Sequence, residues 1–219
     1  MRDADAVSKF FRTHRIGGVI HFAAFKAVGE SVEKPLDYYE NNLSALNILL
    51  KEMTKNGIEN LIFSSSCTVY GQADELPITE KAPVKPAESP YGYSKQVGEI
   101  IIRDTCKATD LKAIALRYFN PIGAHESIKI GELPLGVPQN LIPFITQTAA
   151  GIRKELSVFG DDYPTEDGTQ AHIAALDRLM KGQNETTYEF FNVGTGTGSS
   201  VMEVIKTFET VSVNQVINN

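Results

Sequence analysis

Four short apolar runs, rich in β-branched and aromatic residues, alternate with longer segments along this chain. Gly, Asn or Ser residues bound the runs, which occupy residues 17–24, 60–66, 112–120 and 187–194. Short apolar runs bounded in this way are typical of strands buried on both faces of a parallel sheet. The hydrophobic pattern therefore predicts four parallel strands.

Two of the intervening segments, residues 39–57 and 94–110, repeat their apolar residues at helical spacing. The residues that share a face are Leu43, Leu46, Leu50 and Met53 in the first segment and Val97, Ile100, Ile101 and Cys106 in the second. Gly57 is placed to end the first helix, because glycine readily adopts the backbone conformation found at helix C-termini. Alternating strands and helices predict an α/β fold with a doubly wound parallel sheet.

Composition limits the function class. Of the 219 residues, 42% are hydrophobic and 22% charged, as in an ordinary globular protein with a buried core. The net charge is −6 and there is no basic block, so we expect no nucleic-acid partner and no anionic membrane partner. The chain starts with polar residues and has no long apolar run, so we expect no signal peptide and no membrane span. Two distant cysteines, Cys67 and Cys106, suit a reducing compartment, so we expect a cytoplasmic protein.

The leading candidate for catalysis lies in residues 89–95, SPYGYSK, at the predicted start of the second helix. Tyr91 and Lys95 are four positions apart and would share a helix face. A lysine there would stabilise a tyrosinate and lower the pKa of the tyrosine, as a general base requires. The alternative is a first-turn tyrosine beside a solvated lysine, and the pair alone does not decide between the two.

Three serines, Ser64, Ser65 and Ser66, end the second predicted strand. Ligands of doubly wound sheets bind at the carboxyl ends of the strands. A serine hydroxyl there could hydrogen-bond the same substrate oxygen that Tyr91 deprotonates. The other reading is a polar strand end that caps the following turn.

Other chemistries find less support. The four histidines, His14, His21, His125 and His172, lack metal-ligand spacing, so no metal site is predicted. His21 lies within a predicted strand and is expected to be a packed core residue. No Gly-x-Ser-x-Gly motif supports a hydrolase.

Six stretches of the chain resemble, in the same order, the motifs of one enzyme family. They are HFAAFKAVGESVEKPLDYYENN, FSSSCTVYG, SPYGYSK, LRYFNPIGAH, PQNLIPF and VFGDDYPTEDGT. On these motifs the chain is similar to the UDP-glucose 4-epimerase (UDP-galactose 4-epimerase) family of the extended short-chain dehydrogenase/reductase superfamily. The resemblance implies part of a doubly wound, Rossmann-like NAD-binding domain in residues 1–120. It also implies part of a smaller UDP-sugar-binding region in residues 121–219.

The resemblance implies NAD-dependent interconversion of UDP-galactose and UDP-glucose, and catalytic roles for three residues. Tyr91 would take the proton from the sugar 4-hydroxyl while NAD accepts the hydride from C4. Ser66 would hydrogen-bond that oxygen. Lys95 would bind the nicotinamide ribose and lower the pKa of Tyr91. The resulting 4-keto sugar would turn over and receive the hydride on its other face.

The resemblance also implies two sets of binding residues and a homodimer. The residues matched to NAD contacts are Phe22, Ala23, Lys26, Asn41, Ser64, Tyr91, Lys95 and Tyr118. The residues matched to UDP-sugar contacts are Ser66, Tyr91, Asn120, Asn140 and Phe159, of which Phe159 could pack on the uracil face.

Three departures from the family pattern leave other functions open. Relative to the family, we expect the chain to lack the N-terminal strands with their glycine-rich turn, a segment after Thr169, and the C-terminal part. One alternative is therefore a catalytically inactive truncated fragment or isoform that lacks the NAD pyrophosphate loop. A related NAD-dependent nucleotide-sugar dehydratase or decarboxylase is a second alternative, although Thr68 and Val69 stand where a dehydratase would need acids. A third is an interaction module that binds partners through an open sheet edge.

Overall fold

The structure is a computed structural model that describes residues 1–119, 138, 140–156, 171–194 and 201–212. The chain divides into two units. The first unit consists of Met1–Phe119 and Thr169–Val193, and the second of Asn120–Gly168 and Gly194–Asn219. Residues 169–193 thus return to the first unit after the chain has entered the second.

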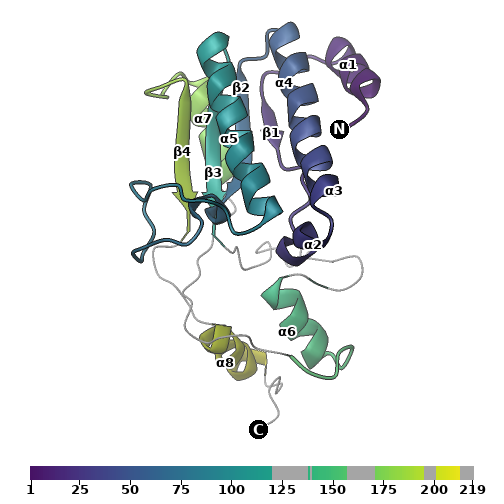
Figure 1. The fold of residues 1–219 in the computed structure, drawn as a ribbon, viewed down its shortest axis with the longest axis vertical. Helices are drawn as coiled ribbons and strands as arrows, with labels where there is room; N and C mark the ends of the chain where they lie inside the picture. The colour runs from purple at the N-terminus through teal and green to yellow at the C-terminus, as the bar shows by residue number, and fades with distance from the viewer. Residues whose placement is uncertain (120–137, 139, 157–170, 195–200, 213–219) are drawn as a thin grey trace. The chain divides into compact units, whose positions relative to one another are not determined.

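The first unit alternates helices and strands along the chain (Figure 1). Its elements are α1 (Ala4–Thr13), β1 (Val19–His21), α2 (Val28–Glu33), α3 (Pro35–Tyr39), the π-helical turn η1 (Glu40–Ser44), α4 (Ala45–Lys55), β2 (Asn60–Ser66), the 3-10 turn η2 (Cys67–Tyr70), α5 (Pro90–Ala108), β3 (Lys112–Tyr118), α7 (Ala171–Met180) and β4 (Tyr188–Val193). All four predicted strands are present, and β1 is the most shortened of them.

The four strands form one parallel sheet in the order β1-β2-β3-β4. In the register of this sheet, Ile20 lies beside Ile62 and Ile62 beside Ile114. Because every strand runs in the same direction, their carboxyl ends meet at one edge of the sheet. Any polar residue that ends one strand is therefore brought near those that end its neighbours.

Helices cover both faces of the sheet, as the alternating side chains of β3 demonstrate (Figure 1). Ala113 and Ala115 pack into a core with α1, α4 and α5, whereas Ile114 and Leu116 pack into a core with α7. The first core includes Val7, Phe11, Leu46, Leu49, Leu50, Met53, Ile102 and Cys106. Two covered faces explain why the strands read as continuous apolar runs rather than as alternating ones.

Helix α5 is anchored at its N-terminus by sequence-local features. The Ser89 side chain accepts a hydrogen bond of 3.1 Å from the Gly92 N–H, and Pro90 occupies the first helical position. Both residue types favour this end of a helix, the serine as a cap and the proline because its backbone angle is already helical. The cap fixes Tyr91 in the first turn and Lys95 one turn later on the same face.

The second unit is described through two helices, α6 (Leu141–Ala149) and α8 (Val201–Ser212). Ile145 of α6 and Ile205 of α8 are fully buried and form a small core. Leu141, Ile142, Ala149, Leu156, Met202, Val204 and Phe208 pack around that core. Among the described residues of both units, no helix is long and apolar enough to cross a membrane.

Candidate functional site

The carboxyl end of β2 meets the N-terminal turns of α5. Lys95 is only 5% exposed, and its Nζ donates a hydrogen bond of 2.7 Å to the Ser64 carbonyl oxygen. The same nitrogen lies 4.9 Å from the centre of the Phe63 ring and 5.8 Å from the centre of the Tyr91 ring. Burial lowers the pKa of Lys95 to about 8, while the negative charge of Glu99 acts in the opposite direction. The lysine is therefore a buried cation rather than a solvated one.

Tyr91 lies beside this lysine and is itself buried, with 9% of its surface exposed. Burial raises the pKa of Tyr91, and a hydrogen bond with the Ser66 side chain partly offsets that rise. Ser66 is buried as the last residue of β2, and its Oγ accepts a hydrogen bond of 3.3 Å from the Thr68 N–H. The strand end thus places a hydroxyl next to the phenol.

Lys95 directs its hydrogen bond away from the Tyr91 hydroxyl in this structure. A lysine that paired with the phenol would lower its pKa, but burial dominates and the pKa of Tyr91 is raised. The physical reason is that Lys95 directs its hydrogen bond at the Ser64 carbonyl, with its Nζ on the ring face of Tyr91.

An aromatic cluster lies at the same edge of the sheet. The Tyr118 hydroxyl is 2.7 Å from Nδ1 of His172, and the two rings stack with their centres 4.9 Å apart. The Phe22 ring centre is 4.2 Å from that of His172, and Phe22 is 59% exposed. Burial raises the pKa of Tyr118 to about 12 and lowers that of His172 to about 4. Within the described part of the chain, the buried Nε2 of His172 has no hydrogen-bond partner.

Asn42, in the π-helical turn, connects the loop after β1 to α5. Its Nδ2 donates to the Phe25 carbonyl and to Oγ of Ser94, both at 3.0 Å, and its Oδ1 accepts from the Phe25 N–H at 2.8 Å. Asn41 also donates to this Oδ1 at 3.1 Å. Single π-helical turns occur frequently at functional sites, and this one holds the loop that carries Phe22 against the helix that carries Tyr91.

Comparison with known proteins identifies the family. The profile of the family described as GDP-mannose 4,6 dehydratase matches residues 1–218. UDP-glucose 4-epimerase from Erwinia amylovora is 48% identical over 96% of this chain and 65% of its own length, and the enzyme of that name from Mus musculus is 49% identical over 96% and 63%. The crystal structure of UDP-glucose 4-epimerase from Bifidobacterium longum, in complex with NAD+ and UDP, is 44% identical and superposes with a TM-score of 0.89, covering 98% of this chain and 67% of that one. The chain belongs to the UDP-glucose 4-epimerase family.

Family membership confirms the resemblance read from the sequence motifs and the α/β, Rossmann-like fold class. The chain spans about 65% of the length of the curated UDP-glucose 4-epimerases it matches, with values between 63% and 66%. A further solved relative, from Stenotrophomonas maltophila, carries bound NAD and formylated UDP-arabinopyranose and is 44% identical, with a TM-score of 0.88.

The structure brings together some of the residues that the UDP-glucose 4-epimerase resemblance assigned. Tyr91, Lys95 and Ser66 are buried at the end of β2, where the carbonyl of the half-buried Ser64 accepts from Lys95. Phe22, Ala23 and Lys26 are exposed in the loop that follows β1, and Asn41 is half-buried in the turn η1. Tyr118 ends β3 at the same edge of the sheet.

Of the five residues assigned to the UDP-sugar, Ser66 and Tyr91 lie in the first unit at the end of β2 and the start of α5. Asn120 and Phe159 lie outside the described residues. Asn140 is described and immediately precedes α6 in the second unit. Their roles in binding remain predictions.

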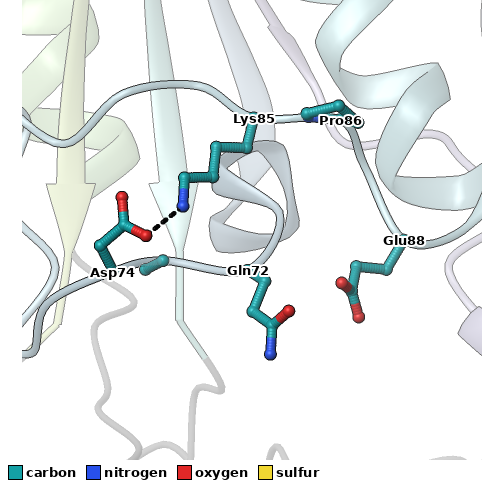
Figure 2. Close-up of a pocket in the computed structure, with 6 residues that line it drawn as sticks. Gln72, Asp74, Lys85, Pro86 and Glu88 are labelled. Carbon is teal, nitrogen blue, oxygen red and sulfur yellow. Dashed lines mark hydrogen bonds and ion pairs between the residues drawn. The ribbon is translucent and has the colours of Figure 1, made fainter.

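Two hollows in the first unit differ in their relation to the predicted residues. An apolar groove of about 860 Å3 follows β1, and its lining includes Val7, Phe10, Ile20, Phe22 and Ala23. A polar hollow of about 490 Å3 lies in the loop between β2 and α5 and contains none of the predicted residues. In it, Lys85 reaches toward Asp74 and pairs with it, while Gln72 and Glu88 line the other side (Figure 2).

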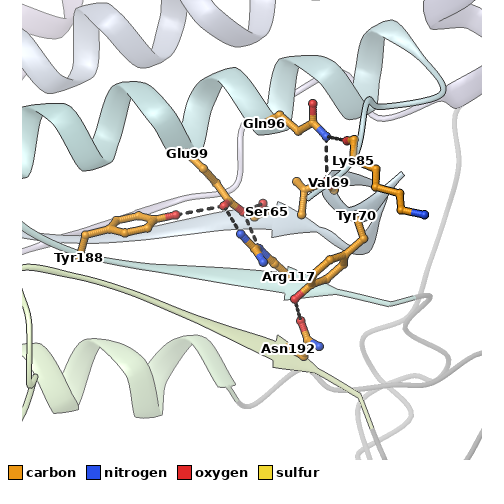
Figure 3. Close-up of polar contacts among 9 residues, drawn as sticks. All are labelled: Ser65, Val69, Tyr70, Lys85, Gln96, Glu99, Arg117, Tyr188 and Asn192. Carbon is orange, nitrogen blue, oxygen red and sulfur yellow. Dashed lines mark hydrogen bonds and ion pairs between the residues drawn. The ribbon is translucent and has the colours of Figure 1, made fainter. Parts of the chain in front are cut away.

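Sequence reasoning missed several buried polar residues of the site: Asn42, Ser94, Glu99, Arg117 and His172. Glu99 of α5 and Arg117 of β3 form an ion pair of 2.6 Å between the helix and the sheet (Figure 3). The one available signal was spacing, because Glu99 continues the four-residue interval from Tyr91 to Lys95. In the residues that the structure covers, no cluster of three His, Cys, Asp or Glu side chains could hold a metal ion.

Proposed function

We propose that this chain acts in the interconversion of UDP-galactose and UDP-glucose through transient oxidation at sugar C4. The observation that carries the proposal is the buried group formed by Tyr91, Lys95 and Ser66 at the carboxyl edge of the parallel sheet, where doubly wound folds bind their ligands. Membership of the UDP-glucose 4-epimerase family supports the same reaction.

In this proposal Tyr91 exchanges a proton with the sugar 4-hydroxyl, and Ser66 hydrogen-bonds the same oxygen. Because burial raises the pKa of Tyr91, its phenolate needs a nearby positive charge at neutral pH. Lys95 is a buried cation of the site and meets that need once it is turned toward the phenol. The same pair returns the proton when the 4-keto sugar is reduced.

The residues of the first unit fit NAD as the cofactor. The exposed Phe22 ring and Ala23 line an apolar groove beside β1, and Asn41, Ser64, Lys95 and Tyr118 add polar groups around the strand ends. Bound NAD supplies the acceptor and donor for the hydrogen at C4. Lys26, Asn140, Asn120 and Phe159 are proposed contacts to NAD or to the UDP-sugar by their match to the family motifs.

Two further proposals concern assembly and location. A homodimer fits the exposed apolar residues Val32 of α2 and Leu36 of α3. A cytoplasmic location fits the two free cysteines, Cys67 and Cys106, since reducing compartments keep thiols unpaired.

The test measures retained NAD by native mass spectrometry and epimerase turnover on the same purified chain. We expect retained NAD and turnover, with turnover reduced about 10²- to 10⁴-fold in Tyr91→Phe because that variant loses the proton-transfer group. Tyr93→Phe is the matched control, since Tyr93 lies two positions along the same helix and is exposed. A folded chain with neither NAD nor turnover would establish the inactive-fragment alternative instead. Full activity in Tyr91→Phe would remove Tyr91 from the mechanism.

A further inference from the structure

A buried carboxylate beneath the catalytic helix has four hydrogen-bond donors around it (Figure 3). Oε1 of Glu99 accepts from Oγ of Ser65 at 2.6 Å and from Nε of Arg117 at 3.0 Å. Its Oε2 accepts from Nη2 of Arg117 at 2.6 Å and from the Tyr188 hydroxyl at 3.1 Å. The donors come from β2, β3 and β4, so one side chain of α5 is bonded to three strands of the sheet.

Glu99 is the third residue of a single face of α5. Tyr91, Lys95 and Glu99 follow one another at intervals of four residues, and positions four apart lie one above the other on a helix. This face lies against three consecutive serines of β2. Lys95 donates to the carbonyl of Ser64, Glu99 accepts from the hydroxyl of Ser65, and the Ser66 side chain acts on the pKa of Tyr91. The contact of Glu99 therefore fixes the position of α5 along β2 for the other two residues.

Arg117, the partner of Glu99, also has contacts of its own that hold it in place. Arg117 is buried, and its guanidinium lies 4.0 Å from the Phe190 ring centre and 4.8 Å from that of Tyr70. Burial acts to lower the pKa of Arg117, but the hydrogen bonds and charge of Glu99 outweigh it and raise that pKa. A buried ion pair adds little net stability over apolar packing, and its best-attested use is to specify one arrangement.

The charges that face Lys95 and Tyr91 come from several elements. Glu99 on α5 is a negative group acting on Lys95, while Arg117 on β3 is positive and paired with Glu99. His21 on β1 is neutral near pH 7, because burial and the charge of Lys95 lower its pKa to about 4. Tyr188 on β4, Tyr38 on α3 and Cys67 after β2 are neutral too, since burial raises the pKa of each.

We propose that Glu99 is a positioning residue for the Tyr91–Lys95 pair, which sets α5 in register on the serines of β2 and supplies the buried counter-charge of the Lys95 ammonium. The role in catalysis rests on the proposed function, whereas the positioning itself does not. The two are separated by a measurement that needs neither NAD nor substrate.

The experiment titrates Lys95 and Tyr91 by NMR in the folded chain, with isotope-labelled lysine and tyrosine side chains assigned through Lys95→Arg and Tyr91→Phe. In Glu99→Gln we expect the Lys95 midpoint to fall by about one pH unit or more, because a buried negative charge is lost and Arg117 is left unpaired. We expect the Tyr91 resonance to move as well, since the register of α5 relaxes. An unchanged Lys95 midpoint in folded Glu99→Gln would overturn the proposal.

Two further variants keep the test decisive. Glu189→Gln is the matched control: Glu189 also binds an arginine in bidentate fashion, Arg178 at 2.9 and 3.1 Å, but on the α7 face of the sheet. Glu189→Gln should leave the titration midpoint of Lys95 unchanged. A shift in this control as large as that in Glu99→Gln would overturn the proposal. If Glu99→Gln fails to fold, the double variant Glu99→Gln/Arg117→Met removes the unpaired charge as well. It should fold and move the Lys95 midpoint in the same direction by a smaller amount, and an unmoved midpoint would again refute the positioning role.

Turnover provides a separate readout. If the proposed epimerase activity holds, the basic limb of the pH profile should move to lower pH in Glu99→Gln by the same amount as the Lys95 midpoint. A chain without turnover removes the proposed function and leaves the NMR result standing.

Discussion

At the scale of single residues, two buried polar side chains of the first unit, Asn42 and Glu99, have partners on other elements. Asn42 bonds to the loop after β1 and to α5, and Glu99 to three strands. A buried polar group without a partner would cost about 1–3 kcal/mol. These residues therefore stabilise one relative placement of the elements that carry Phe22, Tyr91 and Lys95.

His21 makes the stability of the fold depend on pH. Burial, aided by the charge of Lys95, lowers the pKa of His21 from 6.5 to about 4. Between these values the unfolded chain binds the proton and the folded chain does not, so stability falls as the pH is lowered through this window. From about pH 7 to about pH 4.5, His21 should account for about 2–3 kcal/mol of lost unfolding free energy.

Urea denaturation of His21→Gln at both pH values checks this expectation. The variant should lose less stability on acidification than the wild type, by about the amount just given. His14→Gln, at an exposed position after α1, is the control and should follow the wild type. An acid-induced loss in His21→Gln as large as that of the wild type would contradict the assignment.

At the scale of elements, α5 combines a cap, a core face and the face that carries the candidate catalytic residues. Ser89 and Pro90 start the helix, and Ile102 and Cys106 join the core with α4. Tyr91, Lys95 and Glu99 meet the end of β2. Since one helix carries both faces, a change in its core packing should also shift the positions of Tyr91 and Lys95.

The burial of Ile102 predicts that shortening its side chain lowers the unfolding free energy of the chain. Ile102 is 0% exposed, whereas Ile100 on the same helix is 45% exposed. Ile102→Ala should destabilise the chain by about 2–5 kcal/mol through lost burial and the cavity that remains. Ile100→Ala should stay within about 0.5 kcal/mol of the wild type in the same urea titration. Similar losses in the two variants would show that α5 is rotated from the face described.

At the scale of the whole first unit, contacts between distant segments hold the loop between β2 and α5. Asn192 of β4 accepts from the Tyr70 hydroxyl at 2.7 Å, and its Nδ2 donates to the Ile78 carbonyl at 3.0 Å (Figure 3). Gln96 of α5 donates to the Val69 carbonyl from the other side of the loop, at 2.8 Å. The loop leads directly into α5, which carries Tyr91 and Lys95.

Asn192→Ala should loosen this loop. The variant leaves Tyr70 without its acceptor and Ile78 without its donor, so amide hydrogen exchange should rise across residues 71–89. Asn184→Ala is the control, because the Asn184 side chain bonds only two residues away, to the Thr186 carbonyl at 3.0 Å. Mass spectrometry of peptides measures the amide exchange of both variants. Unchanged exchange across residues 71–89 of Asn192→Ala would show that Asn192 does not hold the loop.

The sequence alone was enough to place the four strands, the two long helices, and Tyr91 and Lys95 near the start of the second helix. Each depends on neighbours within a few residues: an apolar run, an interval of four, or a cap such as Ser89. The burial of His21 also followed from its place inside an apolar run. The family motifs added the identity of the fold and of the family, which the comparisons then confirmed.

Only the tertiary structure decided which charges act on the catalytic pair. Glu99 meets Ser65 across 34 positions and Tyr188 across 89, and Tyr70 meets Asn192 across 122. No local pattern encodes such distances, because they depend on how strands and helices are layered. Packing also decided the shift of the Tyr91 pKa. Burial of Tyr91 between α5 and β2 raises that pKa, despite the lysine four positions away. Local spacing thus identified the candidate residues Tyr91 and Lys95, and packing set their electrostatic environment.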